Sequence, residues 1–259
     1  MKYIIPIVLT LGTIIVTWIA AAPESLEECC EYIGLLAPDG VSEVPGQEHV
    51  AIEQAREDGK IPAGVPGLQI GDSAGEIALA DINGKAQTVN FKVREFTVIV
   101  WVSSFCPTSK IYEERVVKLA YDFRSDVQWY AINSSAMESL GELQEHFGKP
   151  TWTLPVLKEQ GADLADRFGA RVTTETYVFG KDGKLLYRGG IDDARQPTRV
   201  EQEYVREVLE ALTNGKAVPF EYQPAKGCCP IDRLGNEEES APAISDKKVD
   251  DTPIEEPVK

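Results

Sequence analysis

Histidine is scarce in this chain of 259 residues, since His49 and His146 are the only two. Two histidines exclude a metal cage built from several imidazoles, and no C-x-x-C-H haem attachment site is present. Basic residues are also few, with 26 Lys and Arg against 42 Asp and Glu and a net charge of −16. A field of this sign repels phosphate backbones, so we expect no nucleic-acid partner.

The N-terminal segment is the longest hydrophobic run. Lys2 precedes an apolar stretch from Tyr3 to Ala22 that ends in three alanines and is followed by Pro23. A basic start, an apolar centre and small residues at the end predict a secretory signal peptide over residues 1–22. The alternative is a retained inner-membrane anchor over residues 4–22, because that length nearly spans a hydrocarbon core. Either way we expect an extracytoplasmic protein, periplasmic or secreted, whose cysteines meet an oxidising environment.

Composition divides the rest of the chain into three parts. Residues 23–67 are acidic and proline-rich, and we interpret them as a linker with short helices. Residues 68–222 have the composition of a globular protein, so we expect them to form one domain. Residues 223–259 contain two adjacent cysteines and then an acidic tail that has too little apolar surface to fold, so we expect the tail to be disordered.

Within residues 68–222 the hydrophobic periodicity predicts an α/β fold. A hairpin signal, Asn83-Gly84, comes first, and a β-branched run at 97–102 predicts a strand that is buried on both faces. Expected strands are 77–82, 87–91, 97–102, 127–133, 176–179 and 185–188, and expected helices are 107–123, 136–147, 162–168 and 199–212, the last capped by Thr198. This order predicts a mixed central sheet with helices on both faces and an N-terminal β-hairpin.

The junction after the buried strand is the candidate site, because open α/β sheets place their chemistry where a strand leads into a helix. Cys106 stands there, directly before Pro107, at the expected helix N-terminus. Unpaired backbone N–H groups and the helix dipole favour a thiolate at this place. The hydroxyl of Ser109, one turn on, could point back at the sulfur, and Lys110 adds a nearby cation. The alternative is that Cys106 is a small buried hydrophobic residue.

The segment W-V-S-S-F-C-P-T-S, residues 101–109, resembles the active-site segment of thioredoxin-like redoxins of the alkyl hydroperoxide reductase and thiol-specific antioxidant group. Residues 173–189 resemble the later strand hairpin of that family. The resemblance covers residues 68–215 and implies a thioredoxin-like fold. An exported bacterial subset of that family has C-P-x-S in place of C-x-x-C and a Gly-Cys segment after the last helix. This chain resembles that subset, with Ser109 as the serine of C-P-x-S and Gly227-Cys228-Cys229 as the later segment.

Several residues depart from the family pattern. Ser109 replaces the second active-site cysteine, and a single cysteine cannot resolve its own mixed disulfide. Thr174 stands where thioredoxins usually hold a cis-proline. Ser103 fits the hydroxyl position of the peroxiredoxin motif, but Ile99 replaces its proline. The resemblance also makes Arg171 a weak candidate for supporting a thiolate or a peroxide.

The remaining four cysteines form two adjacent pairs, Cys29-Cys30 and Cys228-Cys229. About 14 residues separate Asn214 from Cys228, which gives a flexible reach of ~20 Å, so Cys228 or Cys229 could resolve oxidised Cys106. The alternative is structural: disulfides join Cys29 or Cys30 to Cys228 or Cys229. Because the chain has five cysteines, Cys106 would then be the one outside these disulfides. The pairs could also remain thiols or hold a soft metal ion.

The sequence thus predicts an exported thiol-disulfide oxidoreductase, or a protein with peroxidase-like antioxidant activity. The Cys106 thiolate would attack a client protein disulfide or a small peroxide, and another thiol would act as reductant. A redox-inactive thioredoxin-fold binding or scaffold protein is the alternative from a different class. Metal transfer is the weakest alternative. Copper-delivering thioredoxin folds use a C-x-x-x-C pattern, and Lys110 stands where that pattern has its second cysteine. We expect no cofactor and no bound metal.

Overall fold

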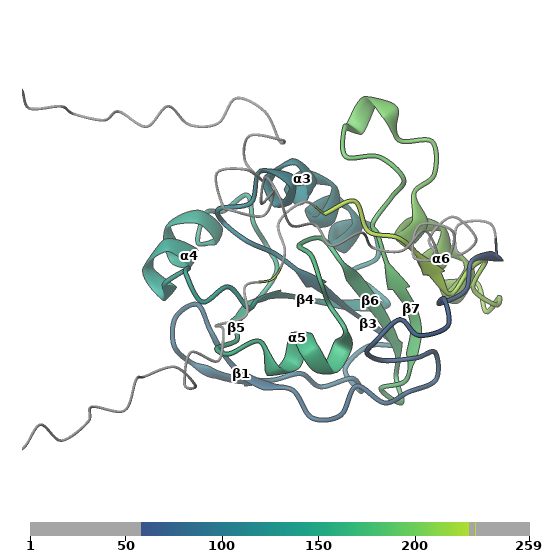
Figure 1. The fold of residues 1–259 in the computed structure, drawn as a ribbon, viewed down its shortest axis with the longest axis horizontal. Coiled ribbons are helices and arrows are strands. Elements are labelled where there is room, and N and C mark those ends of the chain that lie inside the picture. The colour runs from purple at the N-terminus through teal and green to yellow at the C-terminus, as the bar shows by residue number, and fades with distance from the viewer. Residues whose placement is uncertain (1–57, 228–230, 232–259) are drawn as a thin grey trace, which may run out of the picture. The chain divides into compact units, whose positions relative to one another are not determined.

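A computed structural model describes residues 58–227 and residue 231 (Figure 1). The expectations for residues 1–22, for both cysteine pairs and for the acidic tail therefore lie outside the described residues. The elements in chain order are β1 (Ala78–Asp81), β2 (Ala86–Thr88), β3 (Phe96–Trp101), α3 (Pro107–Asp122), β4 (Val127–Asn133), α4 (Leu140–Phe147), β5 (Val156–Lys158), α5 (Asp163–Phe168), β6 (Thr176–Gly180), β7 (Leu185–Gly189), the 3-10 turn η1 (Pro197–Arg199), α6 (Tyr204–Thr213) and β8 (Tyr222–Gln223).

All eight described strands form one sheet in the order β2-β1-β5-β4-β3-β6-β7-β8. The β3-α3-β4 unit has parallel strands, and β6 and β7 continue the sheet from β3 as an antiparallel hairpin. The N-terminal hairpin β1-β2 joins the other edge through an antiparallel pairing with β5. The predicted fold class, a thioredoxin-like mixed sheet with an N-terminal hairpin, is confirmed.

The central strand β3 separates two apolar layers because its side chains alternate between the faces of the sheet. Val98 and Val100 belong to the cluster that α3, α4 and α6 cover. Ile99 and Trp101 belong to the opposite cluster, which α5 and the segment before β1 cover (Figure 1). The prediction of helices on both faces is confirmed, and Trp101 and Trp129 lie in the core as their strand patterns indicate.

Two predicted helix starts are wrong. The helix expected over 136–147 begins only at Leu140, because Ser139 caps it and forms a reciprocal capping box with Glu142. The helix expected over 199–212 begins at Tyr204 without a side-chain cap, and Thr198 lies instead inside the separate turn η1. The short strands β5 and β8 are not predicted from the sequence, since two or three residues carry no recognisable alternation.

The connection from β7 to α6 is fastened to α3 through one buried carboxylate. The Tyr112 hydroxyl donates to Asp192 at 2.9 Å, and the Arg115 guanidinium pairs with the same side chain. Arg115 also donates to the carbonyl of Ala194 at 2.9 Å. Burial nevertheless raises the pKa of Asp192, because the loss of hydration outweighs the attraction of Arg115.

This raised pKa predicts a pH dependence of stability. The folded state retains the Asp192 proton to higher pH than the unfolded chain, whose aspartates titrate near ~3.9. Stability from this group is therefore present below that value and is lost as the pH rises through the folded pKa. We expect Asp192→Asn, which cannot titrate, to gain stability relative to the wild type between about pH 3 and pH 7, measured by urea unfolding. The prediction would be contradicted if the free energy of unfolding of the wild type increased relative to that of Asp192→Asn as the pH rises over this range.

Candidate functional site

Cys106 is the N-cap residue of α3, and Pro107 occupies the first helical turn. The backbone at Cys106 is extended, with φ −75° and ψ 117°, and the helix starts at the next residue. The Sγ atom accepts a hydrogen bond from the Ser109 N–H at 3.4 Å and lies 3.1 Å from the Thr173 Oγ1. A sulfur in the N-cap position receives the stabilisation that a helix N-terminus offers to an anion.

Ser109 and Lys110 are the two expected polar neighbours of Cys106. The Ser109 hydroxyl oxygen accepts a hydrogen bond from the Ser103 N–H at 3.1 Å. Ser109 contacts the sulfur through its backbone N–H, which any residue except proline could supply. Lys110 is exposed and lines a surface groove with Glu113 and other side chains of α3.

The turn before Cys106 is held by Ser103. Its hydroxyl oxygen accepts hydrogen bonds from the N–H groups of Phe105 and Cys106, both at 3.2 Å. Ser103 is therefore used to shape the turn. Phe105 is 52% exposed, whereas Cys106 is 1% exposed, so an apolar ring faces solvent directly beside a covered sulfur.

The segment before β6 faces Cys106, as the resemblance implies, but it is Thr173 that contacts the sulfur. Thr174, the residue expected there, has the left-handed backbone conformation with φ +71°. Its N–H donates to the Trp101 carbonyl at 2.7 Å. Proline has no N–H and cannot adopt this φ, so the observed backbone at Thr174 is incompatible with the proline that thioredoxins usually hold at this place. The peptide bonds of the described residues are all trans.

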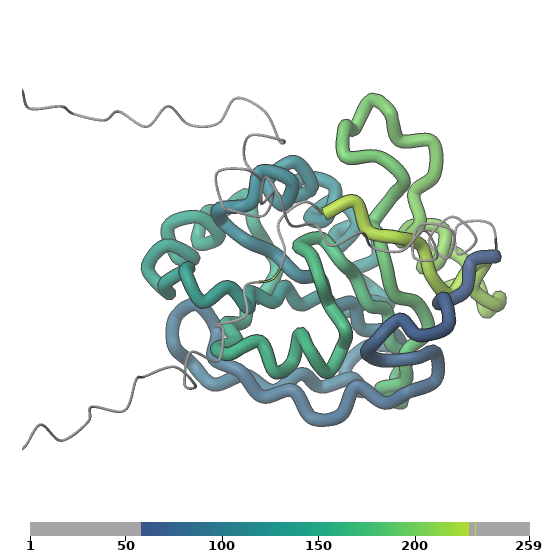
Figure 2. Tube along the Cα trace, in the orientation of Figure 1, coloured from purple at the N-terminus to yellow at the C-terminus, as the bar shows by residue number. Residues whose placement is uncertain are grey.

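The end of the described chain crosses the same region. A Cβ built on Gly227 would lie 2.2 Å from the Thr173 carbonyl oxygen, so the two backbones are in contact and only glycine fits. The N–H of Ile231 donates to the Arg171 carbonyl at 2.9 Å, and Ile231 is buried in the cluster that contains Trp101. Figure 2 shows residues up to 227, in yellow, passing the segment before β6.

Arg171 is exposed, and its backbone N–H donates to the Glu175 carboxylate at 2.9 Å. Its proposed support of a thiolate or a peroxide stays a prediction.

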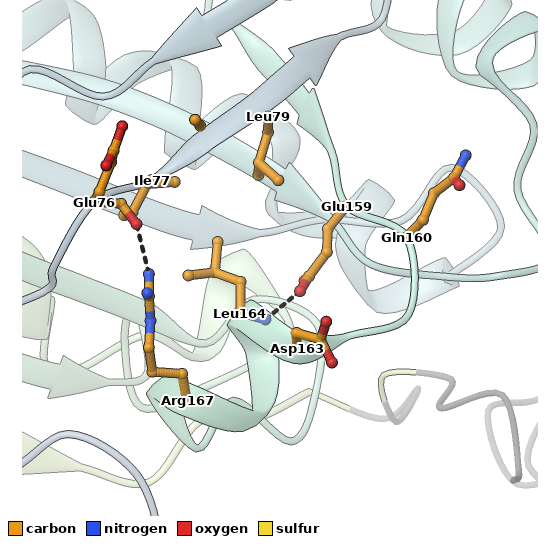
Figure 3. Close-up of a pocket in the computed structure, with 9 residues that line it drawn as sticks. Glu76, Ile77, Leu79, Glu159, Gln160, Asp163, Leu164 and Arg167 are labelled. Carbon is orange, nitrogen blue, oxygen red and sulfur yellow. Dashed lines mark hydrogen bonds between the residues drawn. The ribbon is translucent and has the colours of Figure 1, made fainter.

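A separate pocket of about 330 Å³ lies between β1 and α5 (Figure 3). Its wall includes Glu159, which is 3% exposed and whose carboxylate accepts hydrogen bonds from the N–H groups of Leu164 and Ala165. Glu159 also accepts from the Ser134 hydroxyl, which in turn accepts from the Trp101 indole N–H at 2.9 Å. The carboxylate is thus occupied in capping α5 from the preceding loop, which is a structural use.

Over residues 58–227 and 231, no group of three or more His, Cys, Asp or Glu side chains is arranged to hold a metal ion. In the same part of the chain, no helix has the length and apolar character that a membrane crossing requires.

No protein-family model and no curated protein matches the chain. A hypothetical protein from Sinorhizobium meliloti 1021 has a similar solved structure, with 26% identity and a TM-score of 0.60 over 65% of this chain and 96% of that chain. An uncharacterized conserved protein from Geobacillus kaustophilus has 28% identity and a TM-score of 0.58 over 64% of this chain and 92% of that chain. A thioredoxin-like protein from Aeropyrum pernix is more distant, with 17% identity and a TM-score of 0.39 over 46% of this chain and 83% of that chain. The strand order confirms the thioredoxin-like fold that the sequence resemblance implies, and the first two structures are similar to this chain over more than nine-tenths of their own length.

Proposed function

We propose that the chain is a thiol-based oxidoreductase in which Cys106 is the attacking thiol and Cys228 or Cys229 resolves the oxidised sulfur. The observation that carries the proposal is the contact of Gly227 with Thr173, because Thr173 is also the residue whose hydroxyl lies 3.1 Å from the Cys106 Sγ. Thr173 alone therefore lies between the Cys106 sulfur and the backbone that leads to the cysteine pair, since it contacts both.

Covalent geometry limits where the pair can be. Consecutive Cα atoms are about 3.8 Å apart, and the chain that leads to Cys228 starts from a glycine in contact with the Thr173 carbonyl. Only three residues connect Gly227 to Ile231, and both of these residues contact the segment 171–173. This tether supports an intramolecular reaction far better than the ~20 Å reach of a flexible segment does.

The chemistry needs two sulfurs. With a hydroperoxide, the Cys106 thiolate attacks one oxygen, the O–O bond breaks and an alcohol or water leaves, so that Cys106 becomes a sulfenic acid. The resolving thiolate then attacks the Cys106 sulfur, expels water and forms a disulfide. With a disulfide substrate, the Cys106 thiolate attacks one sulfur, the substrate S–S bond breaks, and the other substrate sulfur leaves as a thiolate. The resolving thiolate then attacks the Cys106 sulfur of this mixed disulfide and releases the remaining substrate sulfur as a second thiolate. In both cases an external dithiol reduces the internal disulfide.

The proposed cellular location depends on residues 1–22, which lie outside the described residues. We propose that residues 1–22 export the chain as a signal peptide or that residues 4–22 anchor it, so that the domain works outside the cytoplasm. The partners in this proposal are a client protein disulfide or a small peroxide and a thiol reductant.

One observation favours a redox-inactive binding module as the second candidate. Cys106 is 1% exposed, which is the exposure of a core residue, and the fold alone does not imply catalysis. Structural bridges from Cys29 or Cys30 to Cys228 or Cys229 fit this second candidate.

Disulfide mapping separates the two candidates. The reduced full-length chain is treated with one equivalent of hydrogen peroxide, quenched by alkylation and mapped by mass spectrometry. We expect a link from Cys106 to Cys228 or Cys229, lost completely in Cys106→Ser and in one of Cys228→Ser and Cys229→Ser. The control Cys29→Ser keeps the link. A map with links only between the two pairs, and none to Cys106, contradicts the proposal.

A further inference from the structure

We propose that Glu138 is the positioning residue for the Cys106 thiol. The proposal rests on the proposed function of Cys106, but it concerns a carboxylate that the sequence pattern places in a helix and that the reaction described above does not use. Glu138 lies between β4 and α4 and is 2% exposed.

Glu138 holds the turn that precedes the cysteine. Its Oε2 accepts hydrogen bonds from both the N–H of Ser104, at 2.6 Å, and the hydroxyl of Ser104, at 2.5 Å. Hydrogen bonds to an ionised acceptor are about twice as strong as those between neutral groups. Ser104 is therefore fixed at two atoms, two residues before the sulfur.

A buried network holds Glu138 in turn. The other oxygen, Oε1, accepts from the Asn133 side-chain amide at 2.9 Å, and the same amide donates to the Val102 carbonyl at 3.0 Å. On the far side, the Lys158 ammonium donates to the Asn133 Oδ1 at 2.6 Å. Asn133 is fully buried and Lys158 is 8% exposed, so a buried cation and a buried anion are joined through one amide.

This arrangement is costly unless every member is satisfied, because an unpaired charge in the interior loses its hydration. When it is satisfied, a buried polar network makes one conformation rigid. The network joins the ends of β3 and β4 with β5, and its last hydrogen bonds go to Ser104. The consequence is a fixed turn from Ser103 to Cys106, which places the Sγ within 3.4 Å of the Ser109 N–H.

The test is the pH dependence of the alkylation of Cys106 in Glu138→Asp. Aspartate keeps the negative charge but withdraws the carboxylate by about 1.5 Å, the length of one C–C bond, so it no longer reaches Ser104. We expect the pKa of the Cys106 thiol to rise by about one unit, because the Ser109 N–H then stabilises the thiolate less well. Iodoacetamide rates between pH 5 and pH 10, followed on the peptide that contains Cys106, give this value.

Ser104→Ala is the second variant, since it removes one donor to Glu138 without a change of charge, and we expect a smaller rise. The matched control is Glu142→Asp, which lies at the surface of α4 and only disturbs the capping box with Ser139. An unchanged thiol pKa in folded Glu138→Asp and Ser104→Ala, with a lower melting temperature alone, would reduce Glu138 to a structural residue and overturn the proposal.

Alkylation requires neither an oxidant nor a second cysteine. A shifted pKa without a Cys106 disulfide therefore supports the positioning role and overturns the proposed function. A Cys106 disulfide without a shift in the two variants supports the proposed function and overturns the positioning role.

Discussion

Arg188→Leu is expected to lower the free energy of unfolding by about 3–5 kcal/mol, because it leaves a buried carboxylate without its cation. Arg188 is 1% exposed and its guanidinium lies 3.2 Å from the Glu175 carboxylate. The same guanidinium donates to the carbonyls of Pro66 at 2.9 Å and Gly169 at 3.0 Å. The substitution therefore removes the hydrogen bonds that join β7 to Pro66 and to the segment 169–175.

Urea unfolding measures the loss. The matched control is Arg167→Leu, because Arg167 is exposed and its guanidinium donates to the Glu76 carbonyl at 3.0 Å on the surface (Figure 3). We expect the control to cost less than about 1 kcal/mol. A loss below ~1 kcal/mol in Arg188→Leu would contradict the prediction, because the ion pair and its hydrogen bonds would then contribute little net stability.

Thr174→Pro is expected to lower the free energy of unfolding by about 3 kcal/mol, even though thioredoxins usually hold a proline at the corresponding place. Proline removes the N–H that donates to the buried Trp101 carbonyl at 2.7 Å, and an unsatisfied buried acceptor costs about 1–3 kcal/mol. Proline also fixes φ near about −65°, whereas this position has φ +71°.

Thr174→Gly is the control, because glycine keeps the N–H and adopts positive φ without strain. We expect its stability to lie within about 1 kcal/mol of the wild type, since relief of strain and loss of chain stiffness oppose each other. Equal stability of the proline variant would mean that the segment 173–174 can rearrange to accommodate a proline, and it would contradict the prediction. Urea unfolding of both variants decides between the two results.

The parts of the fold that depend on local patterns are predictable from the sequence. The β-branched run of β3, the alternation of β4 and the apolar spacing of α3 each report the burial of their own side chains, and their predicted bounds agree with the structure within one residue. The position of Cys106 at the start of α3 follows from the same reasoning, because a strand end and a proline are both local signals.

The surroundings of the sulfur are not predictable in the same way. Thr173 and Glu138 reach Cys106 or its turn from 67 residues after Cys106 and 34 residues after Ser104. Contacts between residues so far apart in the sequence produce no hydrophobic periodicity from which they could be predicted. The sequence pattern predicts Glu138 as a helical residue, although its carboxylate binds Ser104 and the helix starts two residues later. The contact of Gly227 with Thr173 is equally hidden, but a glycine directly before two cysteines is the signal that could have suggested a close approach.

The two ends of the sheet have a consequence for the behaviour of the protein at high concentration. The outermost strands are β2, with three residues, and β8, with two. An edge that short offers few unpaired N–H and C=O groups to a strand of another molecule. The long β-branched strand β3, which would aggregate readily if it lay at an edge, is enclosed between β4 and β6. We therefore expect fibril formation to require unfolding of the sheet, so that the lag time follows global stability and shortens in Arg188→Leu.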